Sequence, residues 1–234
     1  MSTVSSGVRP SIIPPLQPGD QLTRAEFERR YDATPGLKKA ELIEGTVYMP
    51  PPVSDDHGSP HFDLVTFLGI YRFATPGVLG SDNGSIRMDL DNMPQPDLFL
   101  RIDPACGGQT RLSADRYVEG GPELIAEVAV SSASYDLHGK LNVYRRNGVK
   151  EYIVWRTLER GFDYFILRNG TFERVAPAGD GVYRSEVFPG LWIAADALLS
   201  ADLARVQRVL QEGIATQEHA VFVRKLQDAA KPPA

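Results

Sequence analysis

The sequence has 234 residues, 42% of them hydrophobic, which predicts one elaborated domain with a substantial core. Its one cysteine, Cys106, excludes an internal disulfide framework and a cysteine-rich zinc site. We expect a cytoplasmic protein because there is neither a long apolar run nor a basic-then-apolar signal segment. The net charge of −5 excludes attraction of the whole protein to a polyanion, so nucleic-acid binding would need a local patch.

Two tails are expected to flank the domain. Residues 1–20 are rich in Ser, Pro and Gly without periodicity and residues 231–234 read KPPA, so both are predicted to be flexible. Thr23 followed by Glu26 has the spacing of a capping box and predicts a short helix. The next segment, AELIEGTVYMP, alternates around Gly45 and predicts a strand with a turn or bulge, stopped by prolines.

The middle of the chain predicts an α/β fold. Apolar residues recur at helical spacing over residues 59–74. Three strands are then expected, at residues 85–90, 96–102 and 123–130. A helix over 132–148 and a strand over 149–155 follow, and strand, helix, strand predicts a crossover unit.

The last third predicts a hairpin and terminal helices. The segment FDYFILRNGTFERVA predicts two strands joined through Asn169 and Gly170. The sequence from Leu198 onward predicts one long helix of mixed polarity or a helix pair. We therefore expect a domain over residues 21–195 with a C-terminal helical extension over 196–230.

Two acidic residues stand in strand segments that are otherwise apolar. Glu127 lies between Ala126 and Val128 in ELIAEVAV, and Asp97 begins DLFLRI after Pro96. A carboxylate in a buried strand is costly unless it is exposed, paired or metal-bound. Adjacent strands that bring the two acids together favour a divalent cation such as Mg²⁺ or Mn²⁺ between them, with the Val128 carbonyl as a further candidate ligand. The alternative is that each acid is a strand-end residue facing water.

A lysine on the following predicted helix is the third candidate. Asp136, Lys140 and Tyr144 are spaced i, i+4 and i+8 and therefore lie along one helix face. If that face turns toward Glu127, the Lys140 ammonium would orient or activate a water and stabilise developing charge on a phosphate. The alternative is a surface ion pair between Lys140 and Asp136, which contributes little to stability.

The order and spacing of these segments resemble the Uma-two proteins, a family of restriction endonucleases within the PD-(D/E)XK nuclease superfamily. The resemblance spans roughly residues 20–195. It is carried by ELIEGTVYMPPP followed by His57, then QPDLFL, then ELIAEVAVSS, then Asp136, Lys140 and Tyr144 ahead of GVKEYIVW.

This resemblance implies a restriction-endonuclease-like core, in which a central mixed β-sheet is flanked by helices, and Mg²⁺-dependent hydrolysis of DNA phosphodiester bonds. Asp97 and Glu127 would be the metal ligands. The usual lysine of the superfamily lies two residues after the second acid, where this chain has Ala129, and the resemblance implies that Lys140 takes its place. Glu44 resembles an early acidic residue that joins the metal site. A homodimer is also plausible by resemblance.

Three more residues are candidates for substrate binding: His57, Tyr144 and Arg145. His57 matches a position where the family often has histidine, which would contact phosphate or transfer a proton. Its alternative role is that of a loop histidine that caps the next helix. Arg156 stands where similar proteins often have aspartate, a departure from the family pattern.

Two hypotheses follow. The first is a metal-dependent endonuclease, and the second is a catalytically weak or inactive module of the same fold that binds nucleic acid or a protein partner. A small-molecule hydrolase has no supporting motif. Convergence of Asp97, Glu127 and Lys140 within a few ångströms, in a cleft wide enough for nucleic acid, would favour the endonuclease. If Glu127 is instead locked in an internal ion pair, the nuclease interpretation fails.

Overall fold

A computed structural model describes residues 13–130, 132 and 135–231. Much of the expected tails, residues 1–12 and 232–234, lies outside the described residues. Within the remainder of the expected N-terminal tail, Leu16 is buried and the Gly19 N–H donates to the Val47 carbonyl at 2.8 Å. Contacts with the domain therefore begin before residue 21.

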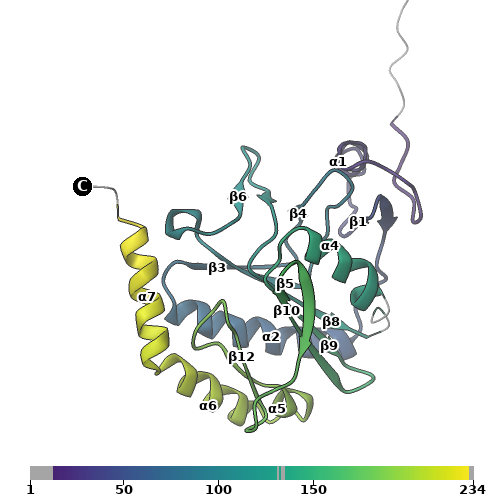
Figure 1. Cartoon of the computed structure of the whole chain (residues 1–234). Helices are drawn as coiled ribbons and strands as arrows, with labels where there is room; N and C mark the ends of the chain where they lie inside the picture. The colour runs from purple at the N-terminus through teal and green to yellow at the C-terminus, as the bar shows by residue number, and fades with distance from the viewer. Residues whose placement is uncertain (1–12, 131, 133–134, 232–234) are drawn as a thin grey trace, which may run out of the picture.

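A six-stranded mixed sheet with the strand order β11-β10-β9-β8-β5-β3 forms the centre of the protein (Figure 1). The strands are β3 (Val78–Asp82), β5 (Leu98–Ile102), β8 (Leu124–Ala129), β9 (Glu151–Arg156), β10 (Gly161–Arg168) and β11 (Thr171–Val175). β8 and β9 are parallel, as the predicted crossover requires, and the other neighbours are antiparallel. This arrangement confirms the predicted α/β fold.

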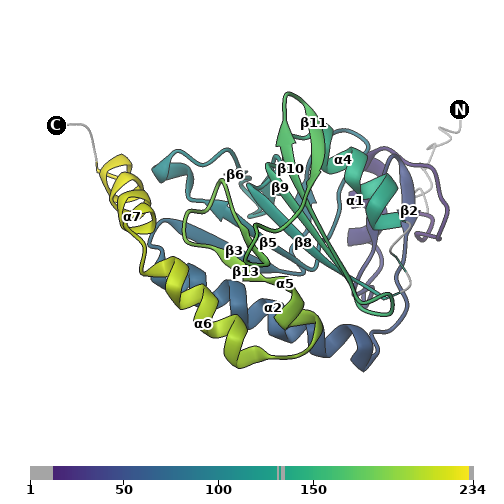
Figure 2. The same ribbon diagram turned by 60° about the horizontal axis from the view of Figure 1, so that its bottom comes forward.

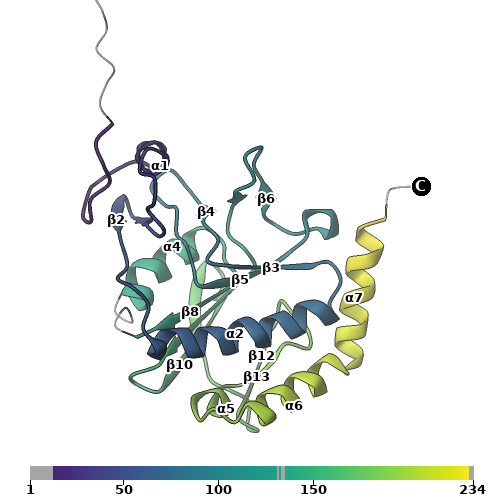
Figure 3. The same ribbon diagram turned by 180° about the vertical axis from the view of Figure 1, so that it is seen from behind.

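Helices cover both faces of the sheet (Figures 2 and 3). The helices are α1 (Arg24–Asp32), α2 (Asp55–Ala74), α4 (Leu141–Arg146), α5 (Ala195–Leu199), α6 (Leu203–Ile214) and α7 (Gln217–Ala229). Helices α2, α5 and α6 share one apolar core with the sheet, and α4 packs into a second core on the opposite face. The buried residues of α6 belong to the first core, so this part of the predicted C-terminal extension packs on the domain.

Smaller elements complete the fold. Two hairpins are formed by β1 (Glu41–Ile43) with β2 (Thr46–Tyr48) and by β12 (Val182–Arg184) with β13 (Trp192–Ala194). A three-stranded sheet contains β4 (Ile86–Arg87), β6 (Arg111–Leu112) and β7 (Val118–Glu119), and a 3₁₀ turn spans Pro104–Cys106. One π-helical turn, Asp136–Lys140, leads into α4. In the described part of the chain, no helix is both long and apolar enough to cross a membrane.

Turn residues explain why the predicted hairpin at Asn169 and a second hairpin at Glu44, where one strand with a turn or bulge was expected, form where they do. Glu44 and Gly45 have φ of 50° and 74°, and Asn169 and Gly170 have φ of 52° and 78°. Two consecutive left-handed residues make the type I′ turn whose twist matches that of paired strands. Each hairpin therefore closes over a two-residue loop.

Two helices begin at identifiable residues. Thr23 caps α1, as predicted, by accepting from the Glu26 N–H. Helix α2 begins at Asp55, four residues before the predicted start, with Asp55 and Asp56 in a first turn whose free N–H groups favour negative charge. His57 is therefore a helix residue, and its interpretation as a loop histidine is wrong.

Candidate active site

The antiparallel pairing of β5 with β8 brings the two candidate acids together. Leu98 pairs with Ala126, which sets Asp97 beside Glu127. The Asp97 N–H donates to Glu127 Oε2 at 3.2 Å, and the Val128 N–H donates to Asp97 Oδ2 at 2.9 Å. Both acids are buried, so the alternative of strand-end acids facing water is wrong.

Lys140 reaches this acid pair from the π-helical turn. Its Nζ lies 2.9 Å from Glu127 Oε1, 3.1 Å from Glu41 Oε1 and 3.5 Å from Asp136 Oδ1. The exposed fraction of Lys140 is 4% and that of Asp136 is 2%, so their pair is not the surface ion pair of the alternative interpretation. Asp97, Glu127 and Lys140 therefore converge, although Lys140 contacts only the second acid of the pair.

The early acid at the site is Glu41, where the resemblance had indicated Glu44. Glu41 is buried in β1, contacts Lys140 and accepts from the Gln95 N–H at 2.7 Å. Glu44 occupies the turn beyond β1, is half-exposed and pairs with Arg146 at 3.0 Å. Because strand residues alternate in direction and the turn reverses the chain after Ile43, the turn acid cannot share the direction of Glu41.

Tyr144 and Arg145, two residues predicted to bind substrate, have partners within the protein. Tyr144 is fully buried and its hydroxyl donates to Glu127 Oε1 at 2.8 Å, so it positions that carboxylate instead of facing a substrate. Arg145 donates to the Gly170 carbonyl at 3.1 Å, in the β10–β11 turn. Sequence spacing alone could not distinguish the buried face of this short helix from its exposed face.

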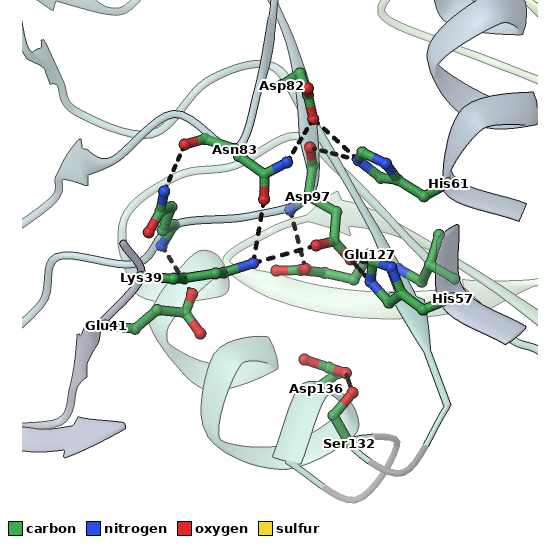
Figure 4. Close-up of polar contacts among 12 residues, drawn as sticks. Lys39, Glu41, His57, His61, Asp82, Asn83, Asp97, Glu127, Ser132 and Asp136 are labelled. Carbon is green, nitrogen blue, oxygen red and sulfur yellow. Dashed lines mark hydrogen bonds and ion pairs between the residues drawn. The ribbon is translucent and has the colours of Figure 1, made fainter. Parts of the chain in front are cut away.

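His57 and Lys39 surround Asp97 (Figure 4). His57 Nε2 lies 3.0 Å from Asp97 Oδ2, and Lys39 Nζ lies 3.3 Å from Asp97 Oδ1. Farther out, His61 Nε2 lies 3.0 Å from Asp82 Oδ1. Lys39 was not predicted, although its position two residues before Glu41 puts both on one face of the chain as it enters β1.

Burial sets opposite protonation preferences for the two acids. Burial raises the pKa of Glu127 from 4.5 to about 8, with Lys140 opposing the rise and Asp97 adding to it. For Asp97, burial acts in the same direction, but the His57 hydrogen bond and the Lys39 charge outweigh it and hold its pKa well below the ordinary value. The carboxylates around Lys140 hold the pKa of that ammonium well above its usual value despite its burial.

Carboxylates outnumber ammonium groups around the acid pair. Four carboxylates, those of Glu41, Asp97, Glu127 and Asp136, face two ammonium groups, Lys39 and Lys140, which leaves two negative charges uncompensated if all are ionised. Within the described ranges, no group of three or more His, Cys, Asp or Glu side chains is arranged to hold a metal ion. The acid pair therefore offers two carboxylates, a number sufficient for Mg²⁺ when water and phosphate complete its shell.

The geometry combines both features that were expected to separate the two hypotheses. The three predicted residues converge, and Glu127 is also in an internal ion pair, but with Lys140 itself. Side chains of the acid pair are at most 5% exposed, so access is limited. A mainly apolar cavity of about 430 Å³ between α2 and β3 is lined by neither Asp97 nor Glu127.

Of the two positions that depart from the superfamily pattern, Ala129 follows Glu127 by two residues on the same side of β8, and Arg156 ends β9. Ala129 is fully buried in the core beneath α4. Arg156, at the end of β9, donates to Asp163 at 2.6 Å and also pairs with Glu159. Both residues therefore have structural contacts of their own.

Comparisons with known proteins agree with this fold. The sequence model of the Uma2 family, described as "Putative restriction endonuclease", matches residues 24–196. A crystal structure described as a "putative nuclease belonging to DUF820", from Anabaena variabilis, superposes with a TM-score of 0.58 at 12% identity, covering 74% of this chain and 96% of that chain. The search of curated proteins found no match.

Proposed function

The chain belongs to the Uma2 family, described as restriction endonucleases, and on this premise we propose that it is a Mg²⁺-dependent endonuclease that hydrolyses phosphodiester bonds of DNA. The observation that carries the proposal is the acid pair, Asp97 beside Glu127, two buried carboxyl groups that the β5–β8 pairing holds side by side. Such a pair is unfavourable without a cation.

Asp97 and Glu127 would hold the cation through their carboxylates. In a strand, the N–H and C=O of one residue point to the same side. Because the Val128 N–H points at Asp97, its carbonyl also faces β5, which supports it as a third oxygen ligand. A divalent cation bound here would lower the pKa of a coordinated water and polarise the phosphate.

Neighbouring residues would hold the two carboxylates in position. Lys140 and Tyr144 both donate to Glu127 Oε1, which leaves Oε2 directed at the backbone of Asp97. His57 holds Asp97 Oδ2 from the other side. We assign Lys140 and Tyr144 as positioning residues, since each acts through Glu127 and both are buried.

One observation favours the second hypothesis, a nuclease-fold module with little or no activity. Glu127 Oε1 already accepts from Lys140 and Tyr144, and the acid pair is almost completely buried. A metal would have to compete for a carboxylate whose burial raises its pKa to about 8. Such a module would bind nucleic acid or a protein partner without cutting it.

Cleavage assays decide between the two. Supercoiled plasmid, single-stranded DNA and RNA would be incubated with Mg²⁺ or Mn²⁺ and the natural protein, Asp97→Asn or Glu127→Gln, with Glu44→Gln as a matched control from the half-exposed turn. We expect activity in the natural protein and the control, loss of at least about a hundredfold in both acid variants, and loss with EDTA. Equal activity in all preparations would reveal a contaminant, and absence of cleavage with retained nucleic-acid binding would favour the second hypothesis.

A further inference from the structure

The following inference rests on the proposed function and assigns its phosphate contact. We infer that Lys39, rather than Lys140, is the cation that donates to the phosphodiester, through a non-bridging oxygen next to Asp97. The candidates for this contact at the acid pair are Lys140, His57 and Lys39.

Lys140 has no donor left for a substrate. An ammonium group has three N–H bonds, and Lys140 Nζ has three carboxylate partners at 2.9 Å, 3.1 Å and 3.5 Å. Only 5% of its side chain is exposed. Donation to a phosphate would require it to release a buried carboxylate, which is strongly unfavourable.

His57 is also unsuited to contact the substrate. Its Nε2 is occupied by Asp97 Oδ2 at 3.0 Å. Its other ring nitrogen, Nδ1, is buried and has no hydrogen-bond partner among the described residues. With one nitrogen engaged and the other away from solvent, His57 can orient Asp97 but cannot present a donor at the surface.

Lys39 combines a partly exposed side chain with a donor left for a ligand. Its side chain is 26% exposed, against 20% for His57 and 5% for Lys140. Two of its N–H groups can donate to Asp97 Oδ1 and Asn83 Oδ1, each at 3.3 Å, which leaves a third for a ligand. In Figure 4, its ammonium group points at Asp97 from the side of Asn83, and His57 approaches Asp97 from the other side.

The fold fixes Lys39 in this position. Ala40 and Leu42 pack in one apolar cluster, and Lys39 and Glu41 alternate with them along the chain as it enters β1. Lys39 and Glu41 point to the same side as a result. A phosphate that reaches Asp97 therefore meets an ammonium group that is already oriented, which is how fixed charges stabilise a transition state.

A contact of this kind recognises the nucleic-acid backbone and not its bases. Phosphate contacts fix position and contribute to the salt dependence of binding, but they carry no direct sequence information. Lys39 should thus affect all oligonucleotide sequences alike. This behaviour distinguishes it from a residue that sets specificity.

The test compares Lys39→Met with Lys38→Met in the full-length protein. Lys38 is the exposed neighbour, so its variant removes the same charge from the same segment. Binding of a fluorescent single-stranded oligonucleotide would be measured by anisotropy in Ca²⁺ over a series of salt concentrations, and cleavage in Mg²⁺ would be measured in parallel. Circular dichroism would establish that each variant is folded, and Lys39→Arg would serve as a conservative rescue.

We expect Lys39→Met to reduce the slope of log affinity against log salt by about 0.7, one phosphate contact on a single strand, and kcat by about a hundredfold. Lys38→Met should leave kcat unchanged, and Lys39→Arg should recover most of it. Metal affinity should stay the same or rise in Lys39→Met, because a positive charge beside Asp97 is removed.

The outcomes separate this inference from the proposed function. Cleavage by the natural protein with no difference between Lys39→Met and Lys38→Met would overturn the role of Lys39 and leave the nuclease intact. Binding that depends on Lys39, without cleavage, would support the phosphate contact and overturn the nuclease. Neither binding nor cleavage by the natural protein would overturn both.

Discussion

Replacing Lys140 with methionine should lower the free energy of unfolding by about 3–5 kcal/mol, the usual effect of removing one partner of a buried ion pair. The substitution preserves most of the side-chain volume but leaves the carboxylates of Glu41, Glu127 and Asp136 without their shared cation. Since domains of this size are stable by about 5–15 kcal/mol, the variant should fold but remain only marginally stable.

The loss should also depend on pH. In the natural protein the pKa of Glu127 is raised from 4.5 to about 8, so the native state holds a proton that the unfolded state releases between these values. The contribution of this group to stability therefore falls as pH rises through that window, by at most about 1.4 kcal/mol per pH unit. Without the Lys140 charge, the pKa of Glu127 rises further and the decline continues to higher pH.

Urea unfolding followed by tryptophan fluorescence at about pH 5 and about pH 8 would measure both effects. Arg146→Met is the matched control, because the ion pairs of Arg146 are exposed and should contribute less than about 1 kcal/mol. Adding Glu127→Gln to Lys140→Met should recover at least about 1 kcal/mol at the higher pH, since glutamine is neutral without the proton that Glu127 must take up on folding. A loss in Lys140→Met no larger than in Arg146→Met would refute the role of Lys140 as the cation that stabilises these buried acids.

Three other predictions test the same structure. Glu44→Asn should raise the free energy of unfolding by about 0.5–1 kcal/mol, because asparagine suits the left-handed turn. It should not lower cleavage, because the residue lies outside the acid pair, and a loss of cleavage would show that Glu44 belongs to the active site. Burial lowers the pKa of His219 below 6.5, so the unfolded state binds its proton more readily, and stability should fall as pH drops below about 6.5. The stability of His219→Gln should lack this fall, and a pH profile identical to that of the natural protein would contradict the role of His219. Mn²⁺ at a hundred times its dissociation constant should stabilise the natural protein and Asp82→Asn by about 2.7 kcal/mol but not Asp97→Asn; equal thermal shifts in all three would place the cation elsewhere.

The elements that the sequence predicts are those with strong local signals. The Asn169–Gly170 turn, the Thr23 cap and the crossover from β8 to β9 are each specified by nearby residues. Strand β3 was not predicted because its sequence, VLGSD, contains a glycine and lacks clear alternation, and its place in the sheet depends on pairing with β5. Non-local pairing of this kind leaves little trace in a single sequence.

The site residues likewise divide into those with a local signal in the sequence and those whose place depends on the fold. Asp97 and Glu127 could be predicted because a carboxylate within an apolar strand requires a partner. Choosing Glu41 over Glu44 required the exact position of the turn, and the inward direction of Tyr144 required the packing of its helix. Lys39 gave no signal of its own, because an exposed-looking lysine before a strand is common until its neighbours in space are known.

The π-helical turn at Asp136–Lys140 gives the site a sensitivity to chain length that composition does not reveal. Such a turn accommodates one residue more than an α-helical turn. Deleting a single residue there, such as Gly139, would remove the local bulge and bring Asp136 from four residues before Lys140 to three, while α4 keeps its phase. A change of length among homologues at this segment should therefore be read first as the gain or loss of this bulge and only then as a change of residue.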